Sequence, residues 1–243
     1  MRSILFMLVF VLFLIISIPF IFILRFIGLF NRRFCVRASQ GIVNTAFRLV
    51  LKVAGARITV LGTENIPKDR AVLYTSNHRS YADIPLGYTT VPHLTGFIAK
   101  KEIAKVPSLS WWMVNMNCLF LDRDDTRQAL KTILTAIDNI KAGYSMFVMP
   151  EGTRNHGDEM LPFKEGTFKI AEKSGCPIIP VAISNSDAIY ELHQPWIRSA
   201  KVVIHYGTPI ETAGMSKEEL KGIGSRVRDI IADMLEEDKK YIS

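Results

Sequence analysis

Cysteine is scarce in this chain, and no cysteine lies near another in the sequence. Cys35, Cys118 and Cys176 are an odd number, lie far apart and form no CxxC pair. Disulfide-stapled domains and structural zinc sites depend on closely spaced cysteines, so neither class is expected. We expect three reduced, structural thiols, as is usual on a cytosolic face.

Several other signals are also missing. The chain has no internal repeat, no low-complexity linker and no second-domain boundary. Lysine and arginine number 30 against 23 acidic residues, for a net charge of +7, which suits nucleic acid, anionic lipid or phosphorylated small molecules. Because no basic–aromatic platform or known motif accompanies the charge, we expect no nucleic-acid partner. We also expect no metal, since ligand spacing is absent among His93, His156, His193 and His205.

One long N-terminal stretch carries no charge. Residues 4–24, ILFMLVFVLFLIISIPFIFIL, form a run of 21 residues that only Ser17 and Pro19 interrupt. As a helix it would be about 31 Å long, close to a hydrocarbon core of roughly 30 Å, and it lacks the polar stripe of a core helix. The competing interpretation is a cleaved signal peptide, whose apolar region is usually about 7 to 15 residues. No small-x-small cleavage site follows here, so we expect membrane attachment.

Basic residues indicate which side of the membrane holds the rest of the chain. Arg2 precedes the apolar run, whereas Arg25, Arg32, Arg33 and Arg37 follow it. The positive-inside bias therefore places the remainder of the chain on the cytoplasmic face, in a membrane of the bacterial inner type.

The form of the anchor is left open by the sequence. Pro19 fits either a kinked span or a hairpin that enters and leaves one leaflet. Residues 38–54 continue with apolar side chains at helical spacing, either as an interfacial helix on the bilayer or as the first helix packed on the following domain. We predict membrane-anchoring helices over residues 1–54 and a single domain over residues 55–243.

From residue 57 onward, short apolar runs alternate with helical patterns. Apolar residues in 126–143 recur at i, i+3, i+4 and i+7, and Ser216 with Glu219 matches a capping box that opens a last helix, to about Glu237. Most of the apolar runs do not alternate with polar residues, which predicts that most of these strands are buried on both faces. These strands cover residues 57–61, 71–76, 118–121, 145–149, 177–183 and 201–206. The pattern predicts one α/β domain.

The segment NHRSYAD, residues 77–83, holds a candidate catalytic pair. The strand before it ends at Ser76 and Pro85 suits the first turn of a helix, so His78 falls in a strand-to-helix turn. On one regular helix His78 and Asp83 would point about 140° apart, but in a turn they can meet. Asp83 would then hold one ring nitrogen and leave the other free as a base. The alternative is that Asp83 is a helix N-cap and His78 an ordinary loop residue.

Two later segments contribute arginines. FLDR, residues 120–123, places Arg123 just past an apolar run, where loops at strand ends commonly hold ligands. PEGTR, residues 150–154, follows another buried run and precedes FKEG at 163–166. A loop with a glycine, a carboxylate and an arginine can fix a phosphate through the guanidinium and backbone amides. Taken singly, Arg123 also fits a surface charge, and PEGTR a turn with one solvated salt bridge.

Together these segments resemble the glycerolipid acyltransferase family, in particular the 1-acyl-glycerol-3-phosphate acyltransferases. That family is marked by NHxxxxD, FxxR, PEGTR with FKxG, and an apolar block with a proline, which here is CPIIPVAI at 176–183. The resemblance spans roughly residues 57–207. Arg79 and Tyr81 stand where the family often has Gln and Trp, and Asn155 stands where a serine is common, differences that bear on substrate choice.

The resemblance implies an O-acyltransferase with a mixed, largely buried β-sheet flanked by helices. Such an enzyme moves a fatty acyl group from acyl-CoA or acyl-carrier protein to the sn-2 hydroxyl of 1-acyl-glycerol-3-phosphate, making phosphatidic acid. His78 would be the general base and Asp83 would orient its ring. No cofactor is implied beyond the acyl donor. The acceptor phosphate would meet Arg123, Glu151, Gly152, Thr153 and Arg154, with Asn77, Lys100, Lys101 and Lys164 as weaker candidates.

Other functions fit parts of the same pattern. Glycerol-3-phosphate, another lysophospholipid and a lyso-aminolipid are alternative acceptors, although the phosphate-binding arginines favour 1-acyl-glycerol-3-phosphate. The motifs indicate neither the type of acyl donor nor an oligomeric state. A lipid hydrolase with Ser76 or Ser80 as nucleophile is a rival, although no GxSxG elbow is present and both serines lie only two residues from His78. A non-catalytic, membrane-bound lipid-binding protein is the third alternative.

Overall fold

A seven-stranded sheet forms the centre of the computed structural model, which describes residues 2–157 and 159–242. The strand order is β1-β7-β6-β2-β5-β3-β4, and only the β6–β7 pair is antiparallel, so the sheet is mixed. The strands are β1 (Arg57–Leu61), β2 (Leu73–Ser76), β3 (Thr95–Lys100), β4 (Leu119–Leu121), β5 (Ser145–Val148), β6 (Ile178–Ser184) and β7 (Lys201–Tyr206).

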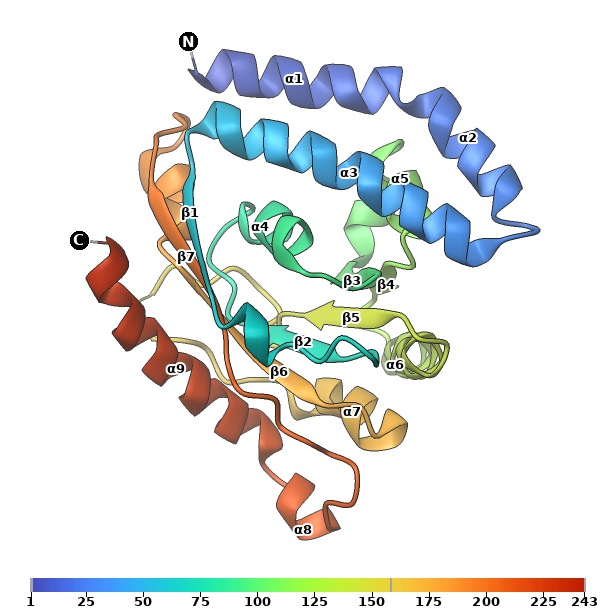
Figure 1. Ribbon diagram of the computed structural model, residues 1–243, viewed down its shortest axis with the longest axis vertical. Helices are drawn as coiled ribbons and strands as arrows, with labels where there is room; N and C mark the ends of the chain where they lie inside the picture. The colour runs from blue at the N-terminus through green and yellow to red at the C-terminus, as the bar shows by residue number, and fades with distance from the viewer. Residues whose placement is uncertain (1, 158, 243) are drawn as a thin grey trace.

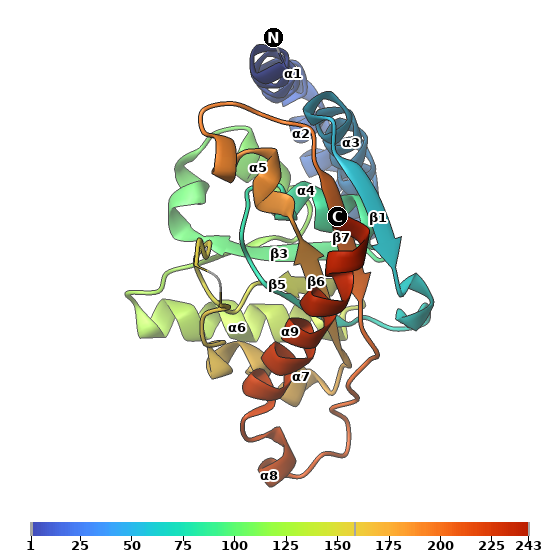
Figure 2. The same cartoon turned by 90° about the vertical axis from the view of Figure 1, so that its left-hand side faces the viewer.

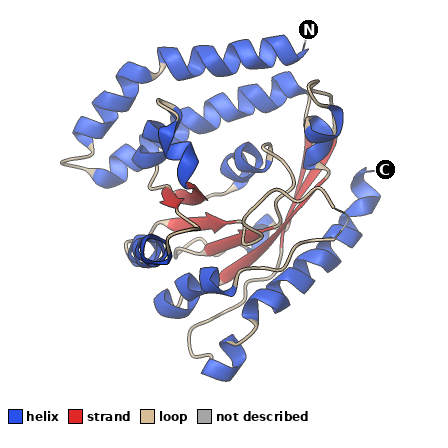
Figure 3. Ribbon diagram, turned by 180° about the vertical axis from the view of Figure 1, so that it is seen from behind, coloured by secondary structure: helices blue, strands red, loops and turns tan. Residues whose placement is uncertain are grey.

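Helices cover both faces of this sheet (Figure 1). One face carries α1 (Arg2–Ile16), α2 (Ile18–Ile27), α3 (Arg32–Ala54), α4 (Asp83–Thr90) and α5 (Leu109–Asn115). The other face carries α6 (Thr126–Lys141), α7 (Lys169–Ser174) and α9 (Ile223–Ile242), with α8 (Lys217–Leu220) before α9. The 3₁₀ turns are η1 (Thr63–Asn65), η2 (Lys101–Lys105), η3 (Glu165–Phe168), η4 (Ser186–Ile189) and η5 (Glu191–His193). Figure 3 shows the strands between these two helical layers.

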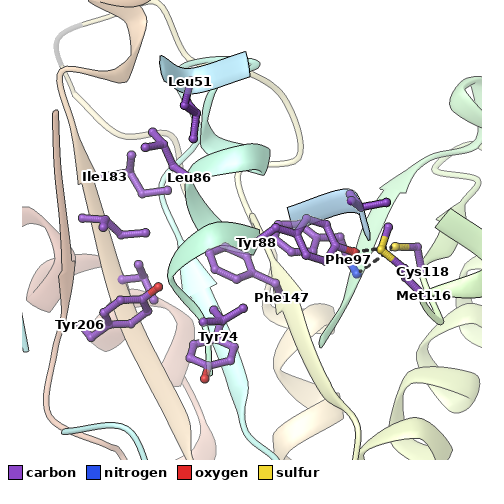
Figure 4. Packing of buried hydrophobic residues seen from close by; sticks show 14 of the residues in the cluster. Leu51, Tyr74, Leu86, Tyr88, Phe97, Met116, Cys118, Phe147, Ile183 and Tyr206 are labelled. Atoms are coloured by element: carbon purple, nitrogen blue, oxygen red, sulfur yellow. Dashed lines mark hydrogen bonds between the residues drawn. The ribbon is translucent and has the colours of Figure 1, made fainter. Parts of the chain in front are cut away.

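The strands divide their side chains between two hydrophobic cores. Tyr74 and Phe147 point into the core under α3 and α4, whereas their neighbours Leu73 and Met146 point into the core under α6 and α9. Aromatic rings stack in the first core, with the centroids of Phe97 and Phe147 4.5 Å apart (Figure 4). Because β2, β5 and β6 are buried on both faces, their sequences do not alternate, and this prediction is confirmed.

The three cysteines are free and buried, as the sequence indicated. The Cys118 thiol lies 2.9 Å from the Tyr88 hydroxyl and 3.4 Å from the amide of Phe97, which donates to it (Figure 4). Burial raises the pKa of the Cys118 thiol, and also that of the Cys176 thiol, above the usual value. Both groups are therefore structural rather than reactive.

Strand β3 is missing from the prediction made from the sequence. Its residues, TGFIAK, include Gly96, which weakens a strand signal. Glycine is required there because a Cβ would lie 2.3 Å from the backbone oxygen of Asn117, just before β4. The close approach of these two backbones therefore explains a residue that looked like a turn signal.

Two predicted helices differ in detail from the structure. The capping box of Ser216 and Glu219 is present, but it opens only α8, since the chain turns at Gly222 (φ 77°) before α9 begins. Helix α6 ends as predicted near Gly143, yet Leu130 and Leu134 of the expected stripe are exposed. Ile137 and Ile140 of that stripe are buried as expected, and Thr132 and Ala136 complete the buried face.

The apolar N-terminal run is not one straight helix. It divides into α1 and α2, which meet at Ser17 with a 45° bend, beside Pro19 in the first turn of α2. Within residues 2–157 and 159–242, no single helix is both long and apolar enough to cross a membrane, although α1 and α2 pass that test as a bent pair. Helix α3 packs on α4, α1 and α2, and α1 and α3 lie side by side at one edge of the molecule (Figure 2).

Candidate active site

The NHRSYAD segment leaves the sheet at the end of β2. The side-chain amide of Asn77 continues the sheet there, because it donates to the carbonyl of Ile183 and accepts from the amide of Ile183, both at 2.9 Å. The backbone of His78 is held on both sides, by a 2.8 Å bond from its amide to Glu151 Oε1 and a 2.8 Å bond from the Asn155 amide to its carbonyl. Asn77 is thus used by the fold, and His78 lies in a strand-to-helix turn as predicted.

His78 and Asp83 are in contact. Nδ1 of His78 lies 2.8 Å from Oδ2 of Asp83, and the amides of Arg79 and Ser80 donate to the same oxygen at 2.9 Å. An oxygen that accepts two amide hydrogens is a carboxylate acceptor, so the proton between the pair belongs to Nδ1. Nε2 of His78 then carries a lone pair. No described residue hydrogen-bonds to Nε2, and the ring is 19% exposed, so this nitrogen is accessible to a substrate hydroxyl.

The carboxylate of Asp83 is buried and makes its hydrogen bonds through one oxygen. Its side chain is fully buried, and its second oxygen, Oδ1, has no hydrogen-bond partner among the residues that the structure describes. Every contact of this carboxylate therefore goes through Oδ2 to the turn between His78 and Asp83. The geometry favours the pair interpretation over an N-cap, because α4 begins at Asp83 itself and no side chain caps it.

A second group of candidate residues meets at the PEGTR loop. Gly152 has a φ of 76°, and a Cβ there would lie 2.7 Å from Lys164 Nζ and 3.6 Å from Arg123 Cζ. Arg123 and Lys164 are exposed, and neither pairs with another described residue. Gly152, Arg123 and Lys164 line a small cavity of about 40 Å³, and its other lining residues are mostly apolar. Two uncompensated cations over a glycine are the arrangement that an anionic group needs.

Arg154 is already occupied in this structure. Its Nη1 lies 3.3 Å from Glu191 Oε1, its Nη2 donates to the Tyr81 hydroxyl at 2.9 Å, and its guanidinium sits 3.7 Å above the Tyr81 ring. Arg79 is similarly paired, with Asp187 at 3.0 Å. A phosphate that approached Arg154 would therefore share that guanidinium with Glu191.

Most of the remaining predicted residues make other contacts in the structure. Lys100 pairs with Glu102 at 3.3 Å, and Lys101 pairs with Asp122 at 2.7 Å, a hydrogen bond that raises the pKa of Lys101 above its usual value. Glu151 is buried and joins the amides of His78 and Leu161, so it fixes the turn instead of facing a ligand. Thr153 is exposed.

Sequence reasoning missed two carboxylates near this site. Asp187 and Glu191 lie on η4 and η5, after β6, and contact Arg79 and Arg154. The only available signal was their spacing of four in SDAIYELH, directly after the apolar block, and no family motif includes them.

The fold and the site define a class first: an α/β enzyme in which a carboxylate-held histidine follows strand β2, and two cations without a partner among the described residues lie around the loop after the neighbouring strand β5. The Acyltransferase family model matches residues 57–184, more than half of the chain. This chain therefore belongs to the acyltransferase family.

Individual relatives agree with this assignment. A 1-acyl-sn-glycerol-3-phosphate acyltransferase of Saccharomyces cerevisiae is 33% identical over 82% of this chain and 67% of its own. One of Borreliella burgdorferi is 30% identical over 82% of this chain and 80% of its own. The crystal structure of the 1-acyl-sn-glycerophosphate acyltransferase PlsC from Thermotoga maritima superposes with a TM-score of 0.80 at 28% identity, covering 98% of this chain and 95% of that one.

Proposed function

We propose that this acyltransferase moves a fatty acyl group from acyl-CoA or acyl-carrier protein to the sn-2 hydroxyl of 1-acyl-glycerol-3-phosphate. The names of the relatives support the acceptor. The observation that carries the chemistry is the 2.8 Å contact of His78 Nδ1 with Asp83, which leaves Nε2 as a base.

The reaction then needs no acyl-enzyme. Nε2 of His78 accepts the proton of the acceptor hydroxyl while its oxygen attacks the thioester carbonyl, and Asp83 stabilises the imidazolium. The tetrahedral intermediate collapses to the ester and expels the thiolate, which takes the proton back from His78. A base of this kind typically contributes about 10²- to 10⁴-fold, so positioning must supply much of the remaining acceleration.

The acceptor phosphate is assigned to the cations around Gly152. Arg123 and Lys164 have no anionic partner among the described residues, so a bound phosphate would neutralise both without breaking an existing ion pair. Thr153 and Arg154 continue the same loop, and Arg154 would add a contact shared with Glu191.

The N-terminal helices are proposed to meet the bilayer that holds the acceptor. These helices expose large apolar residues, among them Ile4, Leu8, Ile23 and Phe26, and Phe30 in the turn after α2 is exposed as well. Their inner face is fixed to α5 by hydrogen bonds from Trp112 Nε1 to Ser17 Oγ (2.9 Å) and from Asn115 Nδ2 to the carbonyl of Ile21 (3.1 Å). This arrangement supports a membrane-bound enzyme. The basic residues that follow the apolar run support a catalytic domain on the cytoplasmic face.

A donor-by-acceptor activity matrix tests the proposal. Purified protein in lipid vesicles receives labelled acyl-CoA or acyl-carrier protein with lysophosphatidic acid, glycerol-3-phosphate, another lysophospholipid or a lyso-aminolipid. We expect phosphatidic acid from lysophosphatidic acid, lost in His78→Ala and kept in the exposed control His156→Ala. Free fatty acid without transfer would indicate a hydrolase, and binding without turnover would indicate a lipid-binding protein.

A further inference from the structure

One buried carboxylate outside the family motifs touches the catalytic turn directly. Glu191, on η5, accepts the Tyr81 amide at Oε1 (2.8 Å) and the Ser80 hydroxyl at Oε2 (2.6 Å). Its side chain is only 1% exposed. Glu191 therefore binds two consecutive residues of the segment that separates His78 from Asp83, although it lies more than 100 positions later in the chain.

These contacts connect to the catalytic pair through very few bonds. The Ser80 hydroxyl that donates to Glu191 also accepts the Ala82 amide at 2.9 Å, while the Ser80 amide donates to Asp83 Oδ2 at 2.9 Å. Asp83 Oδ2 is the only oxygen that this residue offers to His78, because Oδ1 has no partner among the described residues. The turn is thus held by Asp83 on its inner side and by Glu191 on its outer side.

The geometry points to Glu191 as a positioning residue for the proposed acyl transfer: it fixes the Ser80–Tyr81 peptide so that Asp83 holds the imidazole of His78. This inference rests on the proposed function. Glu191 touches no reacting atom; it acts through the turn, and Arg154 compensates its charge at 3.3 Å. A buried carboxylate is costly unless it is paired and hydrogen-bonded, and Glu191 satisfies both conditions with groups of the active site.

Removing the carboxylate should therefore disturb catalysis more than binding. In Glu191→Ala the Ser80 hydroxyl and the Tyr81 amide lose their partner, and the turn can relax away from Asp83. A misplacement of about 1 Å can cost roughly 10²-fold in rate. We expect kcat to fall about 100-fold, with the KM of the acyl donor within about threefold of wild type and the KM of the acceptor not raised, because Arg154 loses its ion-pair partner and can still bind the phosphate. Glu191→Gln keeps one acceptor oxygen and should restore part of the loss, to about tenfold below wild type.

A matched control separates positioning from loss of stability. Asp238 on α9 is also a buried carboxylate that accepts a serine hydroxyl, Ser184 Oγ at 3.0 Å, and it lies 3.1 Å from His205 Nδ1. No hydrogen bond among the described residues joins Asp238 to the turn. Asp238→Asn should change the melting temperature while leaving kcat unchanged below it. If the Glu191 variants lose activity only in proportion to the unfolded fraction, or keep kcat within twofold of wild type when folded, the inference is wrong.

A second readout is independent of turnover. The Nδ1 proton of His78 should give a downfield proton resonance in the folded protein, assigned by its disappearance in His78→Ala. We expect this resonance to broaden or shift upfield in Glu191→Ala and to stay unchanged in Asp238→Asn. An unchanged resonance in Glu191→Ala would overturn the positioning role. Absence of acyl transfer from the wild-type protein, with the resonance still sensitive to Glu191, would overturn the proposed function alone.

Discussion

The imidazole Nδ1 of His78 and the carboxylate Oδ2 of Asp83 lie 2.8 Å apart, and that oxygen also accepts the amides of Arg79 and Ser80. All three donors surround one oxygen atom, so the charge of Asp83 is concentrated where the imidazolium would form. The same geometry fixes the tautomer in which Nε2 is the base. The pair therefore supplies both orientation and charge compensation, and the two contributions can be separated by mutation.

Asp83→Asn removes the charge but keeps an oxygen of similar shape in the turn. We expect turnover to fall about 10²- to 10⁴-fold, because the neutral amide does not stabilise the imidazolium. The domain should stay folded, since the amides of Arg79 and Ser80 keep an acceptor. Initial rates together with a circular-dichroism melt check both parts, with His78→Gln as the reference for loss of the base. Unchanged turnover in a folded variant would contradict the role of the pair.

Arg123→Met and Lys164→Met each remove one of the two cations around Gly152 without shortening the side chain much. A hydrogen bond to a charged group contributes about 1.5–3 kcal/mol, so each change should raise the KM for lysophosphatidic acid at least tenfold. The effect on kcat should be small, because the hydrogen bonds of His78 and Asp83 with other described residues involve neither cation. Steady-state kinetics with Lys169→Met as a control are the measurement, since the one ion pair of Lys169 among the described residues is with Glu172 on the surface. Equal effects on an acceptor that lacks phosphate would contradict this assignment.

Much of the fold was predictable from the sequence, and the reasons are local. The central strands are buried on both faces, so their apolar runs stood out, and β1 and β7 were placed at their observed bounds. Strand β3 was not predicted because its Gly96 looks like a turn signal. This glycine is needed for close contact with the backbone of Asn117, a residue far away in the sequence, and a local pattern does not reveal such a contact. The exposed Leu130 and Leu134 of α6 show the same limit, since helical spacing does not say which of two overlapping stripes faces the core.

The part of the site that lies within one sequence motif could be predicted from the sequence. The contact of His78 with Asp83 follows from a short turn, which sequence order alone suggests. The ion pair of Arg154 with Glu191 could not be predicted from the sequence, because Glu191 lies in a segment that carries no motif. Which cations remain free for a phosphate depends on such remote pairs. The sequence therefore ranked Arg154 above Lys164, whereas in the structure Arg154 is paired with Glu191 and Lys164 has no ion-pair partner among the described residues.

Gly96→Ala tests the approach of β3 to β4. A Cβ at this position would lie 2.3 Å from the oxygen and 2.8 Å from the carbonyl carbon of Asn117, so a backbone must move. Overpacking of this kind typically costs about 1–3 kcal/mol in the free energy of unfolding. Gly41→Ala on α3 is the control, because no atom of the described residues outside its own stretch of helix lies within 4 Å of the added Cβ, and it should raise stability by up to about 1 kcal/mol. Denaturant unfolding in detergent measures both, and equal effects would contradict the prediction.

Trp112→Phe tests the attachment of the N-terminal helices. It removes the indole donor to Ser17 at the bend between α1 and α2 and leaves a buried hydroxyl without this partner. Such a loss costs about 1–3 kcal/mol, and we expect it to loosen the docking of α1 and α2 on α5. Hydrogen exchange of the amides in residues 2–27 should become faster, while exchange in β2 and β5 stays slow. Uniform acceleration throughout the chain would show that the bond stabilises the whole domain and not the docking.

The pH dependence of stability provides a test far from the active site. Burial raises the pKa of Asp238 above its usual 3.8, and the charge of Glu237 adds to this, while Ser184 and His205 oppose it. Just above pH 3.8 the folded state therefore holds this proton while the unfolded chain releases it, so stability must fall as pH rises through that window. In a His205→Gln background, which removes the histidine of the cluster, the melting temperature of the protein should drop between pH 4 and pH 7 relative to the same background carrying Asp238→Asn. A flat or rising difference would show that the Asp238 carboxylate is stabilised by its surroundings more than it is penalised by burial.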